Sequence, residues 1–354
     1  MVDRSLAEKF ERVLNTIKAY PKQFEQAWDE VSALELPENY KSVENIVFCG
    51  MGGSALGARM IDAFTSEGRL RVPFEIFTEY NIPNYAGPKT LVILSSYSGN
   101  TEETINAAST AIAKKSKIFG LTTGGKLAEI LRKESVFGYI FDPKYNPSLQ
   151  PRMSIGYASG AVLAVISKLG LAHIAHAEIK EAIEVMQSAI RELDDSTPES
   201  KNEAMNFVKK IRGKLPVLVS SEHLTGVTHA VKNQFNESAK TFATAFDLPE
   251  LNHHLMEGLA RPSEIKKLLH FVFFTSDLYS NRVRERYPLT ADVVGQNDVG
   301  YDIYHASSKS KLGQIYEVLV FGSFVVYYLT KNLGIDPMTI SWVDYFKQKL
   351  SETS

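Results

Sequence analysis

The sequence reads Gly50-Met51-Gly52-Gly53-Ser54 directly after one apolar run and Ser95-Ser96-Tyr97-Ser98-Gly99-Asn100-Thr101 directly after another. The apolar runs, at 46–49 and 91–94, have the composition of buried strands, and a segment of helical pattern follows each loop. Glycine lets a backbone approach a bound anion, and a helix N-terminus presents unpaired N–H groups with a partial positive charge. The two loops therefore predict a phosphate site. Because neither loop contains a basic residue, backbone dipoles and hydroxyl groups would hold the anion.

The segments around these loops alternate between strand and helix patterns, which is typical of a doubly wound parallel sheet. Strands are expected at 46–49, 74–77, 91–94, 118–121 and 139–141, and helices at 55–64, 102–114 and 126–133. In the flavodoxin-like strand order 2-1-3-4-5, the first and third strands are neighbours whose carboxyl ends open one crevice. Both loops fall at that crevice, so a single phosphate explains them together. Asn100, followed by Glu103, is predicted to cap the second helix in a capping box.

The first loop has two other interpretations. The spacing Gly50-x-Gly52-x-x-Ala55 fits the dinucleotide-binding fingerprint, and Glu79 could meet a ribose. A dinucleotide site would give the second loop no role, so a nucleotide-dependent oxidoreductase explains less of the sequence. The plainest alternative is that both loops are tight turns in which glycine supplies positive φ.

A second α/β alternation follows a helix-rich middle, which extends from about residue 156 to residue 193. The polar run Asp194-Asp195-Ser196-Thr197-Pro198 ends that middle and predicts a domain boundary. Further strands are expected at 217–220, 271–275, 291–294 and 303–305, and helices at 312–333 and 342–350. A chain of 354 residues is long enough for two cores. The predicted organisation is an N-terminal helical extension over 1–40, a first α/β domain over 41–195 and a second over 196–354.

The composition is that of an ordinary globular protein, with 23% charged and 44% hydrophobic residues. A formal net charge of −2 gives no general attraction to nucleic acid or to an anionic membrane. The single Cys49 cannot form an internal disulfide, which favours a cytoplasmic location. The N-terminus is predicted to open an amphipathic helix rather than a signal peptide, and the apolar stretch at 318–329 a buried helix rather than a membrane span. The scattered histidines do not have zinc-site spacing, so no metal and no cofactor are expected.

The two loops resemble those of the sugar isomerase (SIS) domain, a phosphosugar-binding fold, and the segment from Ser96 to Thr101 is the most specific part of the match. The first loop is followed by Pro151-Arg152, by Lys232-Asn233-Gln234-Phe235-Asn236-Glu237 and by Glu250-Leu251-Asn252-His253. In this order the motifs resemble the bifunctional phosphoglucose/phosphomannose isomerase family over nearly the whole chain. The resemblance implies two SIS domains of flavodoxin-like order and a homodimer. It also implies an aldose–ketose isomerase that converts glucose 6-phosphate, and mannose 6-phosphate, to fructose 6-phosphate in glycolysis and gluconeogenesis.

Such an isomerase moves a proton between C1 and C2 of an opened sugar through an enediol, and it needs a base and a cation for the enediolate. By the resemblance, Glu237 is the base. A carboxylate suits this role, since the pKa of a carboxyl group in a partly desolvated pocket rises toward neutrality. Arg152 resembles the arginine whose fixed charge stabilises the enediolate. Taken without the resemblance, Glu237 would be an exposed helix charge and Arg152 a surface arginine paired with a carboxylate.

Ring opening is assigned by the same resemblance to a histidine and a lysine. His253 resembles the family histidine that reaches the active site of the neighbouring subunit, and the order Leu-Asn-His favours it over His254. Lys347 resembles a lysine near the chain end, with Lys349 as the alternative.

The phosphate is expected to bind to backbone and hydroxyl groups of both loops. The residues predicted to hold it are Gly52, Gly53, Ser54, Ser96, Ser98 and Thr101. A different class of function is a non-catalytic phosphosugar-binding SIS protein, such as a sensor or regulator. Sensors of this kind usually carry a basic recognition helix, which the mixed-charge N-terminal segment lacks, and they would not need Arg152, Glu237 or His253.

Overall fold

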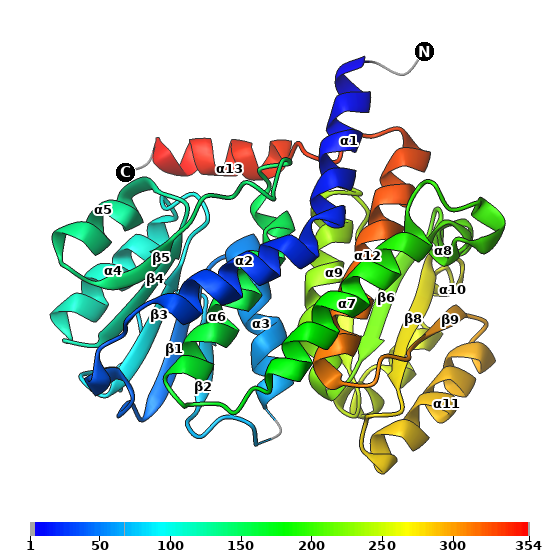
Figure 1. Cartoon of the computed structure of the whole chain (residues 1–354). Helices are drawn as coiled ribbons and strands as arrows, with labels where there is room; N and C mark the ends of the chain where they lie inside the picture. The colour runs from blue at the N-terminus through cyan, green and yellow to red at the C-terminus, as the bar shows by residue number, and fades with distance from the viewer. Residues whose placement is uncertain (1–3, 67, 353–354) are drawn as a thin grey trace.

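Two parallel β-sheets lie on either side of a shared block of helices in the computed structural model (Figure 1). The structure describes residues 4–66 and 68–352. The central block contains α3 (Gly53–Thr65), α6 (Ile155–Lys168), α9 (Thr225–Glu237) and α12 (Lys311–Leu333). One hydrophobic core runs through both halves of the chain, because both sheets contribute to the same cluster of buried side chains.

The first sheet has the strand order β2-β1-β3-β4-β5, and all its neighbouring strands are parallel. This confirms the predicted doubly wound sheet of flavodoxin-like order. Its strands are β1 (Asn45–Gly50), β2 (Phe74–Phe77), β3 (Thr90–Ser95), β4 (Lys117–Thr122) and β5 (Phe137–Ile140). Helices α4 (Glu102–Ala113) and α5 (Gly125–Lys133) bury apolar side chains with those of β1, β3 and β4 in a second cluster.

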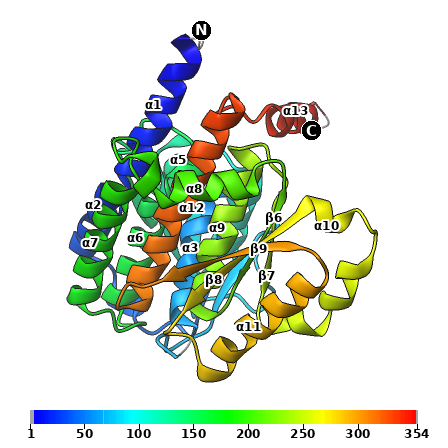
Figure 2. The ribbon, with the colours of Figure 1, turned by 90° about the vertical axis from the view of Figure 1, so that its right-hand side faces the viewer.

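The second sheet repeats this plan with the order β7-β6-β8-β9, again with all neighbours parallel. Its strands are β6 (Leu215–Ser220), β7 (Thr244–Asp247), β8 (Leu269–Ser276) and β9 (Gly300–Ala306). Helices α8 (Glu203–Ile211), α10 (Ile265–Leu268) and α11 (Asn281–Gln296) belong to this half (Figure 2). The chain therefore contains two doubly wound units of the same strand order.

The sequence-based assignment was wrong at two places in the second sheet. Residues 291–294 lie inside α11 rather than in a strand. Their valines suggested a strand, but Tyr287, Ala291 and Val294 are buried at helical spacing. The strand β7 was missed because it has four residues, of which three are half-buried and one is exposed, so it has no clear apolar alternation.

The predicted cap of α4 was also wrong. The cap residue is Thr101, and its side chain makes no capping hydrogen bond. The Asn100 side chain instead accepts the Lys126 N–H at 3.2 Å and donates to the Ser98 carbonyl at 3.2 Å. Asn100 therefore ties the second loop to the first turn of α5 rather than capping α4.

The N-terminal segment forms the two helices α1 (Arg4–Lys18) and α2 (Tyr20–Ala33), and α2 packs closely on α6. The close approach requires glycine, because a Cβ on Gly156 would lie 2.8 Å from the Tyr20 carbonyl oxygen and one on Gly160 would lie 2.7 Å from that of Phe24. Helix α7 (His176–Leu193) packs along α12, and α13 (Ser341–Ser351) lies at the surface without a buried side chain. The extension is thus part of the central helical block.

Helix α12 is long and apolar enough to cross a membrane by length and composition, but its apolar stretch is entirely buried inside the fold. This confirms the expectation of a buried helix. The division of the chain at residues 40 and 195 stays a prediction, because a single core spans the proposed boundaries. The outermost ends of the first and last predicted ranges, 1–3 and 353–354, lie outside the described residues.

We predict that Gly156→Ala lowers the free energy of unfolding by about 1–3 kcal/mol, because the added methyl group must push α2 away from α6. Urea denaturation followed by circular dichroism measures the change. Gly87→Ala is the matched control, since a Cβ there meets no atom within 4 Å. Equal stability of the two variants would contradict the close packing described here.

Candidate functional site

The two predicted loops meet at the carboxyl edge of the first sheet. Gly50, at the end of β1, lies opposite Ser95, at the end of β3. The Ser54 hydroxyl accepts the Tyr97 N–H at 3.0 Å, and the Ser95 hydroxyl donates to the Ser54 carbonyl at 3.0 Å. Ser54 thus joins the loops into one structure, as the strand order predicts.

The second loop is folded around its own hydroxyl groups. The oxygens of Ser96 and Thr101 are 2.8 Å apart, and the Thr101 N–H donates to the Ser96 hydroxyl at 3.4 Å. Ser98 is exposed, and its hydroxyl accepts the Asn100 N–H at 3.3 Å. Gly99 has a φ of +70°, which favours glycine. Neutral donors therefore surround the start of α4, as an anion site without basic residues requires.

A third loop, which the sequence reasoning did not single out, supports the second. It is Thr122-Thr123-Gly124-Gly125, between β4 and α5. The Thr123 hydroxyl donates to the Tyr97 carbonyl at 2.8 Å. A Cβ on Gly99 would lie 1.8 Å from the Gly124 carbonyl oxygen, so the two loops are in direct contact. The sequence did contain a signal for this loop, since it is a third glycine- and hydroxyl-rich turn that follows a predicted strand.

The first loop packs directly against the segment that carries Arg152. Gly52 caps α3 with a φ of +51°, and Gly53 begins the helix. A Cβ on Gly53 would lie 2.5 Å from the Arg152 backbone nitrogen and 2.7 Å from the Pro151 carbonyl carbon. The absence of a side chain at Gly53 therefore allows the phosphate loop and Arg152 to lie side by side.

The Arg152 side chain is 1% exposed and its guanidinium is held from three directions. Nε donates to the Ser238 hydroxyl at 2.9 Å, and Nη1 to the Gln150 side-chain oxygen at 2.8 Å. Nη2 donates to the carbonyls of Pro337 at 2.8 Å and Met338 at 3.1 Å. Burial lowers the pKa of Arg152, and the nearby carboxylates act in the opposite direction. A guanidinium remains protonated in such a setting and supplies a fixed positive charge.

Glu237 is the last residue of α9, and its Oε2 lies 3.5 Å from Arg152 Nη1. The carboxylate side chain is 28% exposed, so it faces both solvent and the buried guanidinium. Burial raises the pKa of Glu237 despite the positive charges of Arg152, Lys347 and Lys240. A carboxylate with a raised pKa beside a fixed cation can take a proton from carbon and return it.

Lys347 lies on α13, and its charge acts on Glu237. Its side chain is exposed. The alternative Lys349 forms an ion pair with Glu352 at 2.7 Å on the same helix. Lys347 is among the positive charges that lower the pKa of Glu237.

His253 lies at the far edge of the second sheet, on an exposed 3-10 turn at Glu250–His253 that follows β7. The end of β7 lies beside the end of β6, from which α9 starts. Glu237 is at the other end of α9, and a helix of 13 residues is about 20 Å long. The chain thus brings together the loops, Arg152, Glu237 and Lys347, but not its own His253. The neighbouring His254 ring packs 5.9 Å from that of Phe246.

At the carboxyl edge of the second sheet, carboxylates of the chain itself accept hydrogen bonds from backbone N–H groups. Glu222 follows β6, and its two oxygens accept the Ser280 N–H at 3.0 and 3.3 Å, where α11 begins. After β9, the carboxylate of Glu317 accepts the N–H groups of Ser307 and Ser308 at 3.0 and 2.8 Å. The N–H groups that could bind a phosphate at these positions already have an anion. We therefore propose the first sheet as the place for a ligand phosphate.

Within residues 4–66 and 68–352, His, Cys, Asp and Glu side chains do not form a group of three that could hold a metal ion. The site consists instead of hydroxyl and N–H donors, one buried guanidinium and one half-buried carboxylate.

Comparisons with known proteins identify relatives of this chain. The family model "Bacterial phospho-glucose isomerase C-terminal SIS domain" matches residues 200–350. The chain is similar to the "Bifunctional phosphoglucose/phosphomannose isomerase" of Caldicellulosiruptor bescii, with 31% identity over 97% of this chain and 99% of that relative. The relative of the same name from Thermoplasma acidophilum is 30% identical over 87% of this chain and 90% of its own length.

The fold is also that of a solved structure, "tagatose-6-phosphate ketose/aldose isomerase from Escherichia coli". The TM-score is 0.67 and the identity is 16%, over 92% of this chain and 93% of that one. At this identity the likeness concerns the fold.

We predict that each chain binds one inorganic phosphate ion, because Glu222 and Glu317 already occupy backbone N–H groups at the carboxyl edge of the second sheet. Equilibrium dialysis with labelled phosphate measures the number of sites. Gly99→Ala should weaken this binding by about tenfold or more, since the new Cβ must displace the second loop and its hydrogen bonds to the anion. Two equivalent sites per wild-type chain, or unchanged binding by Gly99→Ala, would contradict the assignment.

Proposed function

The chain belongs to the bifunctional phosphoglucose/phosphomannose isomerase family, and we propose that it interconverts glucose 6-phosphate, and mannose 6-phosphate, with fructose 6-phosphate. The observation that carries this proposal is the distance of 3.5 Å between the Glu237 carboxylate and the buried Arg152 guanidinium, beside two loops of anion-binding form. A phosphate sensor would need the loops but not this pair. We also retain the expectation of a cytoplasmic enzyme that acts in glycolysis and gluconeogenesis.

In the proposed reaction, the loops of the first sheet hold the 6-phosphate, and Glu237 removes the C2 proton of the open-chain aldose. The electron pair left on C2 moves toward the C1 carbonyl oxygen, and the positive charge of Arg152 stabilises the resulting enediolate. A proton passes from the C2 hydroxyl to the C1 oxygen, and Glu237 returns its proton to C1 as the electron pair on the C2 oxygen forms the new carbonyl, which gives the 2-ketose. The configuration at C2 is lost in the enediol, so the glucose and mannose phosphates share one intermediate and one base.

Ring opening precedes this proton transfer, and we propose His253 of a second copy and Lys347 for it. A homodimer is supported by the distance of about 20 Å along α9 that separates Glu237 from the region of its own His253. His253 is exposed on its turn, as a residue that enters another subunit must be. For Lys347, the support is its electrostatic effect on Glu237.

The direct test is a coupled assay that follows fructose 6-phosphate formation from glucose 6-phosphate and from mannose 6-phosphate in parallel. We expect turnover of both. Tight binding of either sugar phosphate without turnover would instead identify a sensor, and binding of NAD without any response to sugar phosphates would favour an oxidoreductase.

We predict that Glu237→Gln lowers kcat on the order of 100- to 10,000-fold, because it removes the general base while keeping the shape of the side chain. Fructose 6-phosphate binding by calorimetry should stay close to that of the wild type, since the phosphate loops are unchanged. Near wild-type turnover of the purified variant would show that the base is elsewhere.

The acid side of the pH profile gives a second test of Glu237. Only the deprotonated carboxylate accepts a proton, so kcat/KM should fall as the pH drops through the pKa of Glu237, which burial raises above 4.5. Arg152→Met should move this limb to higher pH, because the arginine charge lowers that pKa. Lys349→Met serves as the control, since Lys349 pairs with Glu352. A limb at or below pH 4.5 in the wild type would contradict the assignment.

A further inference from the structure

The segment between α12 and α13, residues 334–340 and hereafter the linker, orients the Arg152 side chain. Its carbonyls at Pro337 and Met338 both accept hydrogen bonds from Nη2 of Arg152, at 2.8 and 3.1 Å. Two acceptors on one nitrogen fix the plane of the guanidinium as well as its position. The direction in which Nη1 faces Glu237 therefore depends on where these two carbonyls lie.

The conformation of the linker is set by Asp336. One carboxylate oxygen accepts the N–H groups of Met338 at 2.8 Å and Thr339 at 3.3 Å. Proline at 337 has a fixed φ and no N–H, so the backbone between these groups has little freedom. The Asp336 carboxylate thus fixes the turn that presents both carbonyls to Arg152.

Two lysines from distant parts of the chain hold Asp336 in turn. Lys9 of α1 contacts its second carboxylate oxygen at 2.6 Å. Lys240 donates to the Asp336 carbonyl at 2.6 Å and to the Ser238 carbonyl at 3.2 Å. Since the Ser238 hydroxyl accepts from Arg152 Nε, Lys240 links the linker to the end of α9 that carries Glu237.

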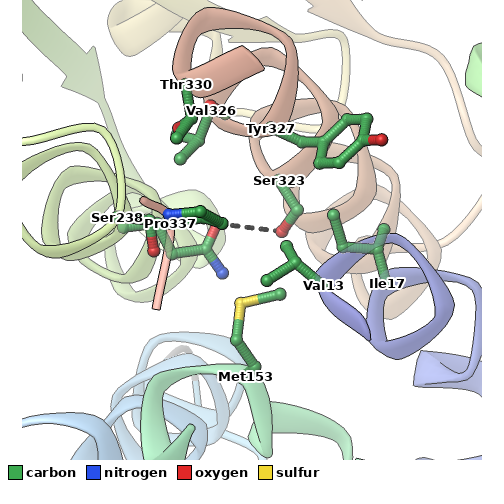
Figure 3. A pocket seen from close by; sticks show the side chains of 10 residues that line it. Val13, Ile17, Met153, Ser238, Ser323, Val326, Tyr327, Thr330 and Pro337 are labelled. Carbon is green, nitrogen blue, oxygen red and sulfur yellow. Dashed lines mark hydrogen bonds between the residues drawn. The ribbon is translucent and has the colours of Figure 1, made fainter. Parts of the chain in front are cut away.

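Pro337 is buried, and a small cavity adjoins it on one side. Pro337 and Ser238 line one side of a cavity, and Val13 and Ile17 of α1 line another (Figure 3). Met153, next to Arg152, lies across the same cavity. An unfilled space removes van der Waals contacts from the groups that line it. The polar contacts of Asp336 therefore add to the packing that positions Pro337.

We propose that Asp336 is a positioning residue for the isomerisation, which acts by holding the Pro337 and Met338 carbonyls on Arg152, and that Lys9 supports it from the N-terminal helix. The proposal rests on the proposed function, because it takes Arg152 as the cation of the enediolate. A small rotation of a cation that must face a developing charge lowers the rate of the chemical step. The phosphate loops lie on other elements, so substrate binding should change little.

The test compares Asp336→Ala in two backgrounds, the wild type and Arg152→Lys, with kcat and KM for fructose 6-phosphate as the readouts. In the wild type, Asp336→Ala should lower kcat on the order of 10- to 100-fold with KM within about threefold. Lysine lacks the second guanidinium nitrogen that the carbonyls hold. In the Arg152→Lys background the same change should therefore lower kcat by no more than about twofold. An equal loss of kcat in both backgrounds, or no loss in the wild type, would overturn the proposal.

Conservative variants separate positioning from a loss of folding. Asp336→Asn keeps an acceptor for the Met338 and Thr339 N–H groups and should recover most of kcat. Lys9→Met, which leaves the linker sequence intact, should lower kcat in the same direction by a smaller factor. This variant decides the question if Asp336→Ala does not fold, and unchanged kcat in Lys9→Met would then overturn the role of the pair.

Lys41→Met, at an exposed ion pair with Glu38, is the matched control and should keep wild-type kcat. An inactive wild type would instead reject the proposed function.

Discussion

A buried guanidinium is the constraint on which the rest of the site depends. Removing a charge from water costs several kcal/mol, and only well-placed hydrogen bonds and an opposite charge offset that cost. Arg152 obtains them from its own turn, from the end of α9 and from the linker after α12, while its backbone touches the first phosphate loop. Because these groups come from both halves of the chain, the hydrogen bonds of this one side chain tie the halves together. Glu237 receives its position, and part of its electrostatic environment, from the same arrangement.

The two sheets show how one topology can give a ligand site in one copy and a closed structure in the other. Both have a switch point between their first and third strands in chain order. At the first, short hydroxyl side chains leave room for an anion beside the helix N-termini. At the second, the carboxylate of Glu222 from the same chain accepts the N–H group at the start of α11. The φ of Glu222 is +47°, a backbone conformation unusual for a residue with a side chain. The second unit instead supplies Glu237 and the linker that orients Arg152.

The sequence was informative where function depends on a few contiguous residues. The two loops and the order of the first sheet follow from local motifs and the rules of parallel sheets, whereas the proximity of Arg152 to Glu237 was implied only by the family resemblance. The misassigned strand at 291–294 and the missed β7 show the limit of local patterns. The valines at 291–294 suggested a strand, but packing places them in a helix. The strand β7 is too short to show an apolar alternation. The contacts of Asp336 with Lys9 and Lys240 could not be read from the sequence. They join residues far apart in the chain, and surface-type residues such as these have no periodic pattern.

The contact between Lys9 and Asp336 spans nearly the whole chain, and this has a consequence for synthesis on the ribosome. The first sheet and both of its loops are complete once residue 140 has emerged, so a nascent chain can form the phosphate site early. Arg152, however, lacks its Pro337 and Met338 acceptors until almost the last residues have been made. Until then burial of its charge would lack two of the hydrogen bonds that offset the cost of leaving water. The full set of hydrogen bonds to the Arg152 guanidinium can thus form only when the chain is nearly finished.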